Sequence, residues 1–368
     1  MSNIEGLLSV AAYRLCAAQR PMILVGPEGA PVSAAIVELA QLLGAPILTT
    51  PDALSVIEPS HSSGTFSFGA SAHARAIVEQ ADVVLAISAL GEFTCRLGEA
   101  FRRHSVIQIA ERQTDVGRNL RPVVSLVGPT IRQSVDGLLR ALRCLSPQPV
   151  QAWPELARPA ATDPYLVPTR PGFIPPIAAI AAIQAALPEA ARLCLDVTSG
   201  ALHAYEHLRL TSSQRTFSSI ENSACMGEAL LASLGIRLAS NLPTLALVGD
   251  WGFCMCPAEL HTAVELGLDR YVVLVWANGG GAFIGAGVAQ QGIVVPDSVW
   301  RWQTPPRFAQ VAEAYGARGV TVSDAATLRS ELSRALAEAR PVVIEARIDP
   351  SAHVPAGDRF LTLGEARA

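Results

Sequence analysis

Residues 245–281 read LALVGDWGFCMCPAELHTAVELGLDRYVVLVWANGGG, and this stretch decides the fold of the chain. Leu245 to Val248 is a short apolar run with the length of a buried strand, and Tyr271 to Trp276 is a second run, apolar on both faces. Between the two runs, apolar residues recur at helical spacing over 259–266, and Pro257 lies where a helix can begin. The stretch therefore predicts a strand–helix–strand unit of a parallel sheet.

One polar side chain follows each of these two strands. Asp250 comes after the first strand and Asn278 after the second, so both lie at the carboxyl edge of the sheet, where open parallel sheets bind ligands. A carboxylate and an amide oxygen are suitable ligands for Mg²⁺, and a glycine-rich turn before a helix exposes N–H groups that hold phosphate. The pair therefore indicates a Mg²⁺–diphosphate site. The alternative is that Asp250 caps a helix and Asn278 forms a turn.

The same stretch resembles the cofactor motif of the thiamine diphosphate-dependent enzymes of the acetohydroxyacid synthase, pyruvate decarboxylase and benzoylformate decarboxylase group. That motif begins Gly-Asp-Gly, continues through a Glu-Leu-x-Thr-Ala helix and closes on Asn-Asn. Residues 249–250 (Gly-Asp) and 259–263 (ELHTA) match it in register. Trp251 replaces the second glycine, and Ala277 with Asn278 replaces Asn-Asn, one residue late unless Asp269 or Arg270 is an insertion.

The resemblance implies a role for several residues of this stretch. Asp250, Asn278 and the backbone carbonyl group of Gly280 correspond to the metal ligands of the family. The residues expected against the cofactor are Gly249, Trp251 and Gly252.

A second motif, Met226-Gly227, precedes Asp250 by 24 residues, at a place where the family has Met-Gly or Leu-Gly. The resemblance implies that Met226 props thiamine diphosphate into the bent shape that brings its aminopyrimidine nitrogen to its thiazolium carbon. It also implies that the carbonyl group of Ala224 accepts a hydrogen bond from the aminopyrimidine. The alternative for Met226 is ordinary core packing.

Hydroxyl groups follow an earlier predicted strand, Arg192 to Leu195. Thr198 and Ser199 lie where that strand ends and a helix begins, so they predict either a phosphate seat or a helix cap. The corresponding segment of benzoylformate decarboxylase contacts the diphosphate. His203 and His207 lie one turn apart on the following helix, and without a third ligand they predict a helix surface or pocket wall, not a metal site.

Strand and helix patterns alternate along the whole chain and predict two doubly wound parallel sheets, an α/β fold. Residues 1–145 form the predicted central, Rossmann-like domain, in which GPEGA at 26–30 reads as a strand–helix turn, since it lacks the GxGxxG spacing of a nucleotide-phosphate loop. A proline-rich linker follows at 146–176, then the diphosphate-binding domain at 177–352 and a tail at 353–368. The expected strands of the first domain are 22–25, 46–49, 83–87, 106–109 and 123–127, and its expected helices are 4–19, 31–43, 71–80, 94–103 and 130–142.

Composition excludes several classes of function. The net charge of the 368 residues is −4 without a basic tract, which argues against nucleic acid as a partner. All 28 basic residues are arginine, so Schiff-base chemistry and a Walker-type lysine are excluded. No apolar run approaches the length of a membrane span, and seven scattered cysteines without a secretory signal fit a reduced cytoplasm. Cys254 and Cys256 have no second pair at zinc spacing.

The resemblance covers the central and diphosphate-binding domains, about residues 20–350, and not the pyrimidine-binding domain that supplies the catalytic glutamate in this family. It implies one subunit of a split enzyme that uses thiamine diphosphate and Mg²⁺ to cleave or ligate C–C bonds of a 2-oxo acid or acyloin. The implied partner is a chain of about 150–200 residues that carries the glutamate, in a heterotetramer with two copies of each chain. One alternative is a non-catalytic or regulatory cofactor-binding homologue, which Trp251 and Ala277 favour. Another is a dinucleotide enzyme, which requires the GxGxxG that is missing after the first strand.

Overall fold

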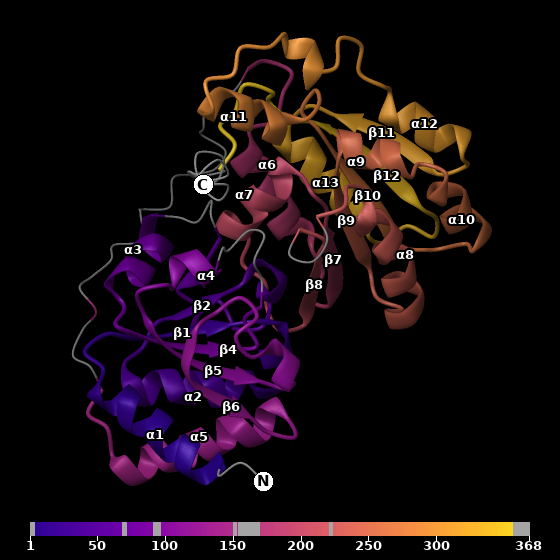
Figure 1. Cartoon of the computed structure of the whole chain (residues 1–368). Helices are drawn as coiled ribbons and strands as arrows, with labels where there is room; N and C mark the ends of the chain where they lie inside the picture. Colours follow the sequence, from indigo (N-terminus) through magenta and orange to yellow (C-terminus); the bar gives the residue numbers. More distant parts are fainter. Residues whose placement is uncertain are drawn as a thin grey trace. The chain divides into compact units, whose positions relative to one another are not determined.

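Two six-stranded parallel sheets, each covered by helices on both faces, make up the computed structural model of the chain (Figure 1). The structure describes residues 4–67, 72–90, 97–149, 153, 170–220 and 224–355. It divides into two units, residues 1–160 and 161–368. The predicted α/β class with two parallel sheets is confirmed. None of the helices in the described ranges combines the length and the hydropathy needed to cross a membrane.

The first sheet has the strand order β3-β2-β1-β4-β5-β6, the order of a doubly wound nucleotide-binding fold. Its strands are β1 (Pro21–Val25), β2 (Ile47–Thr49), β3 (Gly64–Thr65), β4 (Val83–Ile87), β5 (Ser105–Ala110) and β6 (Pro122–Val127). Its helices are α1 (Ile4–Ala17), α2 (Ser33–Leu43) and α5 (Ile131–Leu145) on one face, and α3 (Ala72–Gln80) and α4 (Leu97–Ala100) on the other. Short 3₁₀ turns are η1 (Pro27–Val32), η2 (Pro51–Ala53) and η3 (Gln113–Asp115).

The first unit follows the expected pattern closely, because its central strands are apolar on both faces. Ile23 and Leu85 pack under α1, α2 and α5, while Leu24 and Val84 pack under α3 and α4. The expected helices at 71–80 and 94–103 appear as α3 and α4, with residues 71 and 91–96 outside the described residues. The turn after β1 is a strand–helix turn, as expected, and a Cβ at Gly26 would overlap the carbonyl oxygen of Ser88.

The second sheet has the strand order β11-β12-β10-β9-β7-β8. Its strands are β7 (Ala191–Leu195), β8 (Gln214–Ser218), β9 (Thr244–Gly249), β10 (Tyr271–Ala277), β11 (Arg318–Val322) and β12 (Val342–Arg347). Helices α8 (Glu228–Ser240), α9 (Asp250–Met255), α10 (Glu259–Glu265) and α12 (Phe308–Ala314) share one core with the sheet. The remaining elements are α6 (Pro176–Ala186), α7 (Ser199–His207), α11 (Ala282–Gln290), α13 (Ala325–Ala335) and the 3₁₀ turn η4 (Asp297–Val299).

The helix expected after Pro257 is confirmed as α10, and a short helix that the sequence did not predict, α9, begins directly after β9. Pro257 lies between the two helices. The sequence predicts that residues 279–287 are too flexible to form core. The structure instead has helix α11 over residues 282–290, with Gly285 and Gly287 buried. Its Gly285 lies so close to the ring of Trp300 that a Cβ would overlap the ring, so glycine is needed for packing at this position.

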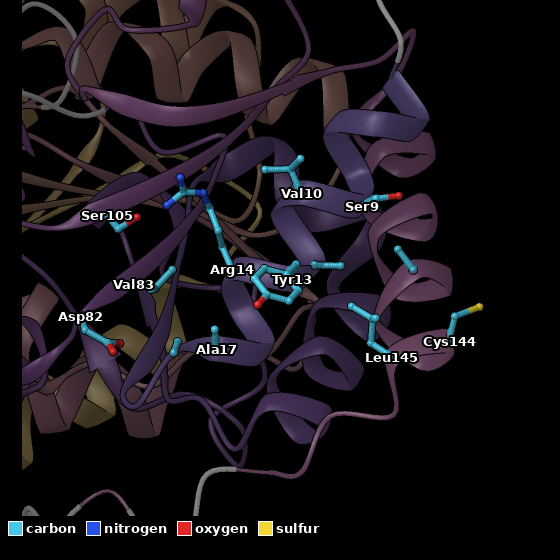
Figure 2. Close-up of a pocket in the computed structure, with 13 residues that line it drawn as sticks. Ser9, Val10, Tyr13, Arg14, Ala17, Asp82, Val83, Ser105, Cys144 and Leu145 are labelled. Carbon is cyan, nitrogen blue, oxygen red and sulfur yellow. The ribbon is translucent and has the colours of Figure 1, made fainter.

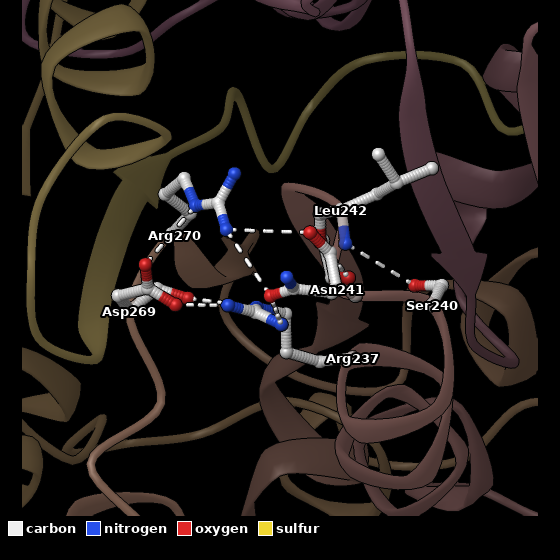
Figure 3. A network of polar contacts seen from close by, with 7 residues as sticks. Arg237, Ser240, Asn241, Leu242, Asp269 and Arg270 are labelled. Carbon is white, nitrogen blue, oxygen red and sulfur yellow. Dashed lines mark hydrogen bonds and ion pairs between the residues drawn. The ribbon is translucent and has the colours of Figure 1, made fainter.

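A polar network fixes the amino edge of the second sheet (Figure 3). Arg237 near the end of α8 is buried, pairs with the carboxylate of Asp269, and donates from Nε to the backbone carbonyl of Asp269 at 2.9 Å. Arg270 donates to the other oxygen of Asp269 at 3.1 Å and to the backbone and side chain of Asn241. These contacts tie the carboxyl end of α8 to the start of β10. The amino end of the same helix therefore has a fixed place at the opposite edge of the sheet.

Candidate functional site

The second sheet has its topological switch point between β7 and β9. The chain runs from β7 outward to β8 on one side and returns to β9 on the other. Asp196 follows β7, Asp250 follows β9 and Asn278 follows β10, so three polar residues end neighbouring strands at the carboxyl edge. Ligands of open α/β sheets bind at this position. Asp196 was not singled out from the sequence, although it follows a buried strand as Asp250 does.

Asp250 is the first residue of α9 and is 2% exposed. Its Oδ2 accepts a hydrogen bond from the backbone N–H of Gly280 at 2.7 Å, and its Oδ1 accepts one from its neighbour Trp251 at 2.8 Å. Burial raises the pKa of this carboxyl to about 7, and the neighbouring N–H groups of the backbone and of the Trp302 side chain offset the shift only in part. Asp250 is therefore a buried acid whose neighbours among the described residues are neutral N–H donors, with no cationic side chain beside it.

Asn278 joins the end of β10 to the start of α7. Its Nδ2 donates to the hydroxyl oxygen of Ser199 at 3.0 Å, which leaves the amide oxygen to serve as a ligand. Thr198 caps α7, because its hydroxyl oxygen accepts from the N–H of Gly200 at 3.3 Å. The cap interpretation of Thr198 is confirmed, and a contact of Thr198 or Ser199 with phosphate stays a prediction.

The glycines after Asn278 are held by an antiparallel bridge to residues 300–302. The N–H of Gly281 donates to the carbonyl oxygen of Trp300 at 2.6 Å, and the N–H of Trp302 donates to that of Gly279 at 2.8 Å. Gly280 has a φ of 135°, and a Cβ there would overlap the carbonyl oxygen of Trp300. Only glycine fits this position, which places its N–H against Asp250.

Trp251 packs inside its own unit. Its ring meets Trp302 in a T-shaped contact with a centroid separation of 6.2 Å, and it covers Gly281, where a Cβ would lie 3.0 Å from the ring. Its Nε1 is shielded from solvent. The sequence predicts an indole that turns outward onto a pocket or a neighbouring subunit. The structure instead shows it laid over the glycine-rich segment, because Gly281 has no side chain to exclude it.

Met226 lies on a strained turn before α8. Ala224 has a φ of 51° and Gly227 a φ of 87°, so left-handed residues flank Met226 on both sides. Met226 is 39% exposed, which is not the burial of a core residue. Residues 222 and 223 of the motif lie outside the described residues.

His203 and His207 lie on α7 with their rings stacked at 6.3 Å. Burial lowers the pKa of His203 to about 3, so its ring is neutral at physiological pH. In the described part of the chain, no three His, Cys, Asp or Glu side chains gather as a metal-binding group. The candidate metal site therefore offers a single carboxylate, with amide and carbonyl oxygens as its other ligands.

A separate groove of about 1060 Å³ lies in the first unit between α1 and α5, beside the starts of β4 and β5 (Figure 2). Its walls are mostly small or apolar side chains such as Val10, Tyr13 and Leu145. Arg14 and Asp82 are the two charged residues that line it. The groove lies at the amino edge of the first sheet, because Asp82, Val83 and Ser105 line it where β4 and β5 begin.

The residues at the carboxyl edge of the second sheet fit a divalent cation with a diphosphate. Asp250, the amide oxygen of Asn278 and the carbonyl of Gly280 are oxygen donors, the type that Mg²⁺ prefers. Burial is the main cause of the raised pKa of Asp250, and no cationic side chain of the described residues contributes to it; a bound cation would offset the cost of burying the charged carboxylate.

Comparison with known proteins shows the family to which the chain belongs. Residues 8–138 match the family model of the thiamine pyrophosphate enzyme central domain, and residues 196–346 match that of the C-terminal TPP-binding domain of thiamine pyrophosphate enzymes. The chain is 25% identical over 371 residues to an acetolactate synthase large subunit of Porphyra purpurea, covering 95% of this chain and 60% of that protein.

Two bacterial relatives have a similar sequence identity to the chain. The isozyme 3 acetolactate synthase large subunit of Escherichia coli (strain K12) is 25% identical over 369 residues, covering 95% of this chain and 63% of that protein. A probable 2-ketoarginine decarboxylase of Pseudomonas aeruginosa is 26% identical over 351 residues, covering 92% of this chain and 60% of that protein. The chain thus spans less than two thirds of each of these relatives. Both matched domains and the relatives place the chain in the family of thiamine diphosphate-dependent enzymes.

Proposed function

We propose that the second unit binds the diphosphate of thiamine diphosphate through Mg²⁺ at the carboxyl edge of its sheet. Asp250, Asn278 and the carbonyl of Gly280 would hold the metal ion. Met226 and the carbonyl of Ala224 would contact the rings of the cofactor. The residues proposed to line the diphosphate are Thr198, Ser199, Gly249, Trp251 and Gly252.

The observation that carries this proposal is the environment of Asp250. Its carboxylate is 2% exposed and is held by the N–H groups of Trp251 and Gly280. A buried charge without a counter-charge is unfavourable. A divalent cation beside Asp250 offsets this cost, and Asn278 at the end of the neighbouring strand adds a second oxygen ligand.

We propose that the reaction cleaves or forms a C–C bond next to a carbonyl group, with a 2-oxo acid or acyloin as substrate. Bound thiamine diphosphate supplies the carbon nucleophile for such chemistry. Support comes from the names of the relatives, since acetolactate synthases and a probable 2-ketoarginine decarboxylase both act at such bonds. The residues of this chain bind and orient the cofactor, and the buried edge around Asp250 excludes water.

We propose that a pyrimidine-binding domain on a separate chain completes the site and provides the glutamate that exchanges a proton with the cofactor. Two copies of each chain, related by a two-fold axis, would form the assembly. The two acids that follow β7 and β9 do not take the role of that glutamate. Asp250 is the proposed metal ligand, and Asp196 accepts hydrogen bonds from backbone N–H groups. A cytoplasmic location is part of this proposal.

A non-catalytic cofactor-binding homologue is the second candidate. Trp251 and Ala277, which stand where the family motif has glycine and asparagine, favour it. This candidate shares the cofactor site and differs by having no turnover with any partner.

Calorimetric titration of the purified chain with thiamine diphosphate tests the proposed site. With Mg²⁺ we expect saturable binding that chelation of the metal with EDTA removes, because the diphosphate has no lysine to hold it and depends on the cation. Thiamine without phosphate is the matched control and should not bind measurably. Equal binding of thiamine diphosphate with Mg²⁺ and with EDTA would contradict the proposal.

A further inference from the structure

One buried carboxylate, that of Asp196, joins the segments that carry the candidate cofactor residues. Asp196 follows β7 directly and is fully buried. The N–H of Gly227 donates to both of its carboxylate oxygens at 2.9 Å, and the N–H of Ala229 donates to Oδ1 at 3.3 Å. These donors belong to the turn after Met226 and to the first turn of α8. The carboxylate therefore ties the end of β7 to the turn that carries Met226.

The backbone of α9 closes the other side of this carboxylate. A Cβ at Gly252 would overlap Oδ2 of Asp196, so glycine is needed there for the two segments to touch. A Cβ at Gly227 would in turn lie 3.0 Å from the carbonyl oxygen of Gly252. Gly252 is two residues beyond Asp250. Asp196 therefore fixes the position of the Met226 turn relative to the proposed metal ligand.

The turn that Asp196 holds is strained. Ala224 lies in the left-handed region at a φ of 51°, which is unfavourable for a residue with a Cβ. Such a conformation persists only where neighbouring groups fix it. The N–H of Ala224 donates to the carbonyl oxygen of Ser219 at 3.1 Å on one side of Met226, and the bonds to Asp196 fix the other side.

We propose that Asp196 is a positioning residue that clamps the turn of Met226 at a fixed place relative to Asp250, so that Met226 meets the cofactor in one orientation. The proposal rests on the proposed function. Met226 is 39% exposed, so its position follows from its backbone and not from core packing. Among the described residues, the hydrogen bonds to the carboxylate of Asp196 come from backbone N–H groups, among them those of Gly227 and Ala229, and Asp196 does not take part in the reaction.

A double-mutant cycle on thiamine diphosphate affinity tests whether Asp196 acts through Met226. Asp196→Asn keeps the size of the side chain but turns one acceptor into a donor that faces the N–H of Gly227. We expect it to weaken binding about tenfold in the wild-type background and less than about twofold in a Met226→Ala background. An equal loss in both backgrounds, or no loss in either, would overturn the proposal.

Amide hydrogen exchange of the ligand-free chain gives a second readout. We expect Asp196→Asn to speed exchange at Gly227 and Ala229 at least about tenfold. Asp324→Asn is the matched control, since Asp324 caps α13 by accepting from Thr327 and should leave these two amides unchanged. Unchanged exchange at Gly227 and Ala229 in Asp196→Asn would show that the clamp does not exist.

The two measurements separate this proposal from the proposed function. If the wild-type chain binds no thiamine diphosphate, the proposed function fails, and exchange alone decides whether Asp196 holds the turn. A thermal melt confirms that each variant is folded. Should Asp196→Asn not fold, Asp196→Ser adds no volume beside Gly252, loses the two-oxygen acceptor, and takes its place in both tests.

Discussion

Replacing Asp250 with alanine is expected to abolish Mg²⁺-dependent binding of thiamine diphosphate. Loss of a buried charged partner from an ion pair typically costs about 3–5 kcal/mol, which is roughly two to four orders of magnitude in Kd. The folded chain should survive, because the wild-type carboxyl is already unfavourably buried, as its raised pKa shows. Calorimetry with and without Mg²⁺ measures the effect. Glu313→Ala, which removes an exposed acid of α12, is the control and should bind as the wild type does.

The pH dependence of the wild type provides an independent check on Asp250. Mg²⁺ binds the ionised carboxyl, so a proton competes with it, and affinity should rise with pH through about 7 and then level off. Stability of the metal-free chain has the opposite trend. The pKa of Asp250 is raised from 3.8 to about 7 in the fold, so its contribution to stability is present at low pH and is lost as the pH rises across that window. Metal affinity that does not change between pH 6 and 8 would argue against Asp250 as the ligand.

Turnover is expected only when a separate pyrimidine-binding chain is present. General acid–base catalysis contributes about 10²–10⁴-fold, so the proposed glutamate of the partner should raise the rate by at least about 100-fold. Co-expression of the two chains, size-exclusion chromatography and a decarboxylation assay on pyruvate and benzoylformate measure this. A partner with its glutamate replaced by glutamine is the matched control, and it should bind this chain without restoring turnover.

The opposite outcome would point to an acid within this chain. Glu228, beside the turn of Met226, is the first candidate by position. Substantial turnover by the chain alone, lost in Glu228→Gln, would contradict the need for a partner glutamate. No turnover with any partner, together with intact cofactor binding, would favour the non-catalytic homologue.

The sequence predicts the strands of both sheets wherever they are continuous runs of apolar residues. Such runs, as in β9 and β10, are buried on both faces in the structure. Strand β8, with the sequence QRTFS, was missed because it is a polar edge strand, and β3 because it has two residues. Helix α9 was missed because residues 250–255 carry no helical repeat of apolar side chains.

The sequence predicts where the site lies but not which of its side chains contact one another. Asp250 and Asn278 follow β9 and β10, and these paired parallel strands end at the same edge of the sheet. The bond between Asn278 and Ser199 joins residues 79 positions apart, and a sequence does not say which side chains meet across an edge. Trp251 is a similar case, since its place depends on Gly281, 30 residues later. Asp196 was missed because an aspartate after a strand also fits a simple helix cap.

A crystal structure of the chain with thiamine diphosphate and Mn²⁺, a cation that anomalous scattering locates, would show whether Asp250 holds the metal ion. We expect one metal ion held by the carboxylate of Asp250, the amide oxygen of Asn278 and the carbonyl oxygen of Gly280, with the diphosphate bound to that ion. A metal ion or a diphosphate located elsewhere, with Asp250 bound only by the N–H groups of Trp251 and Gly280, would contradict this expectation.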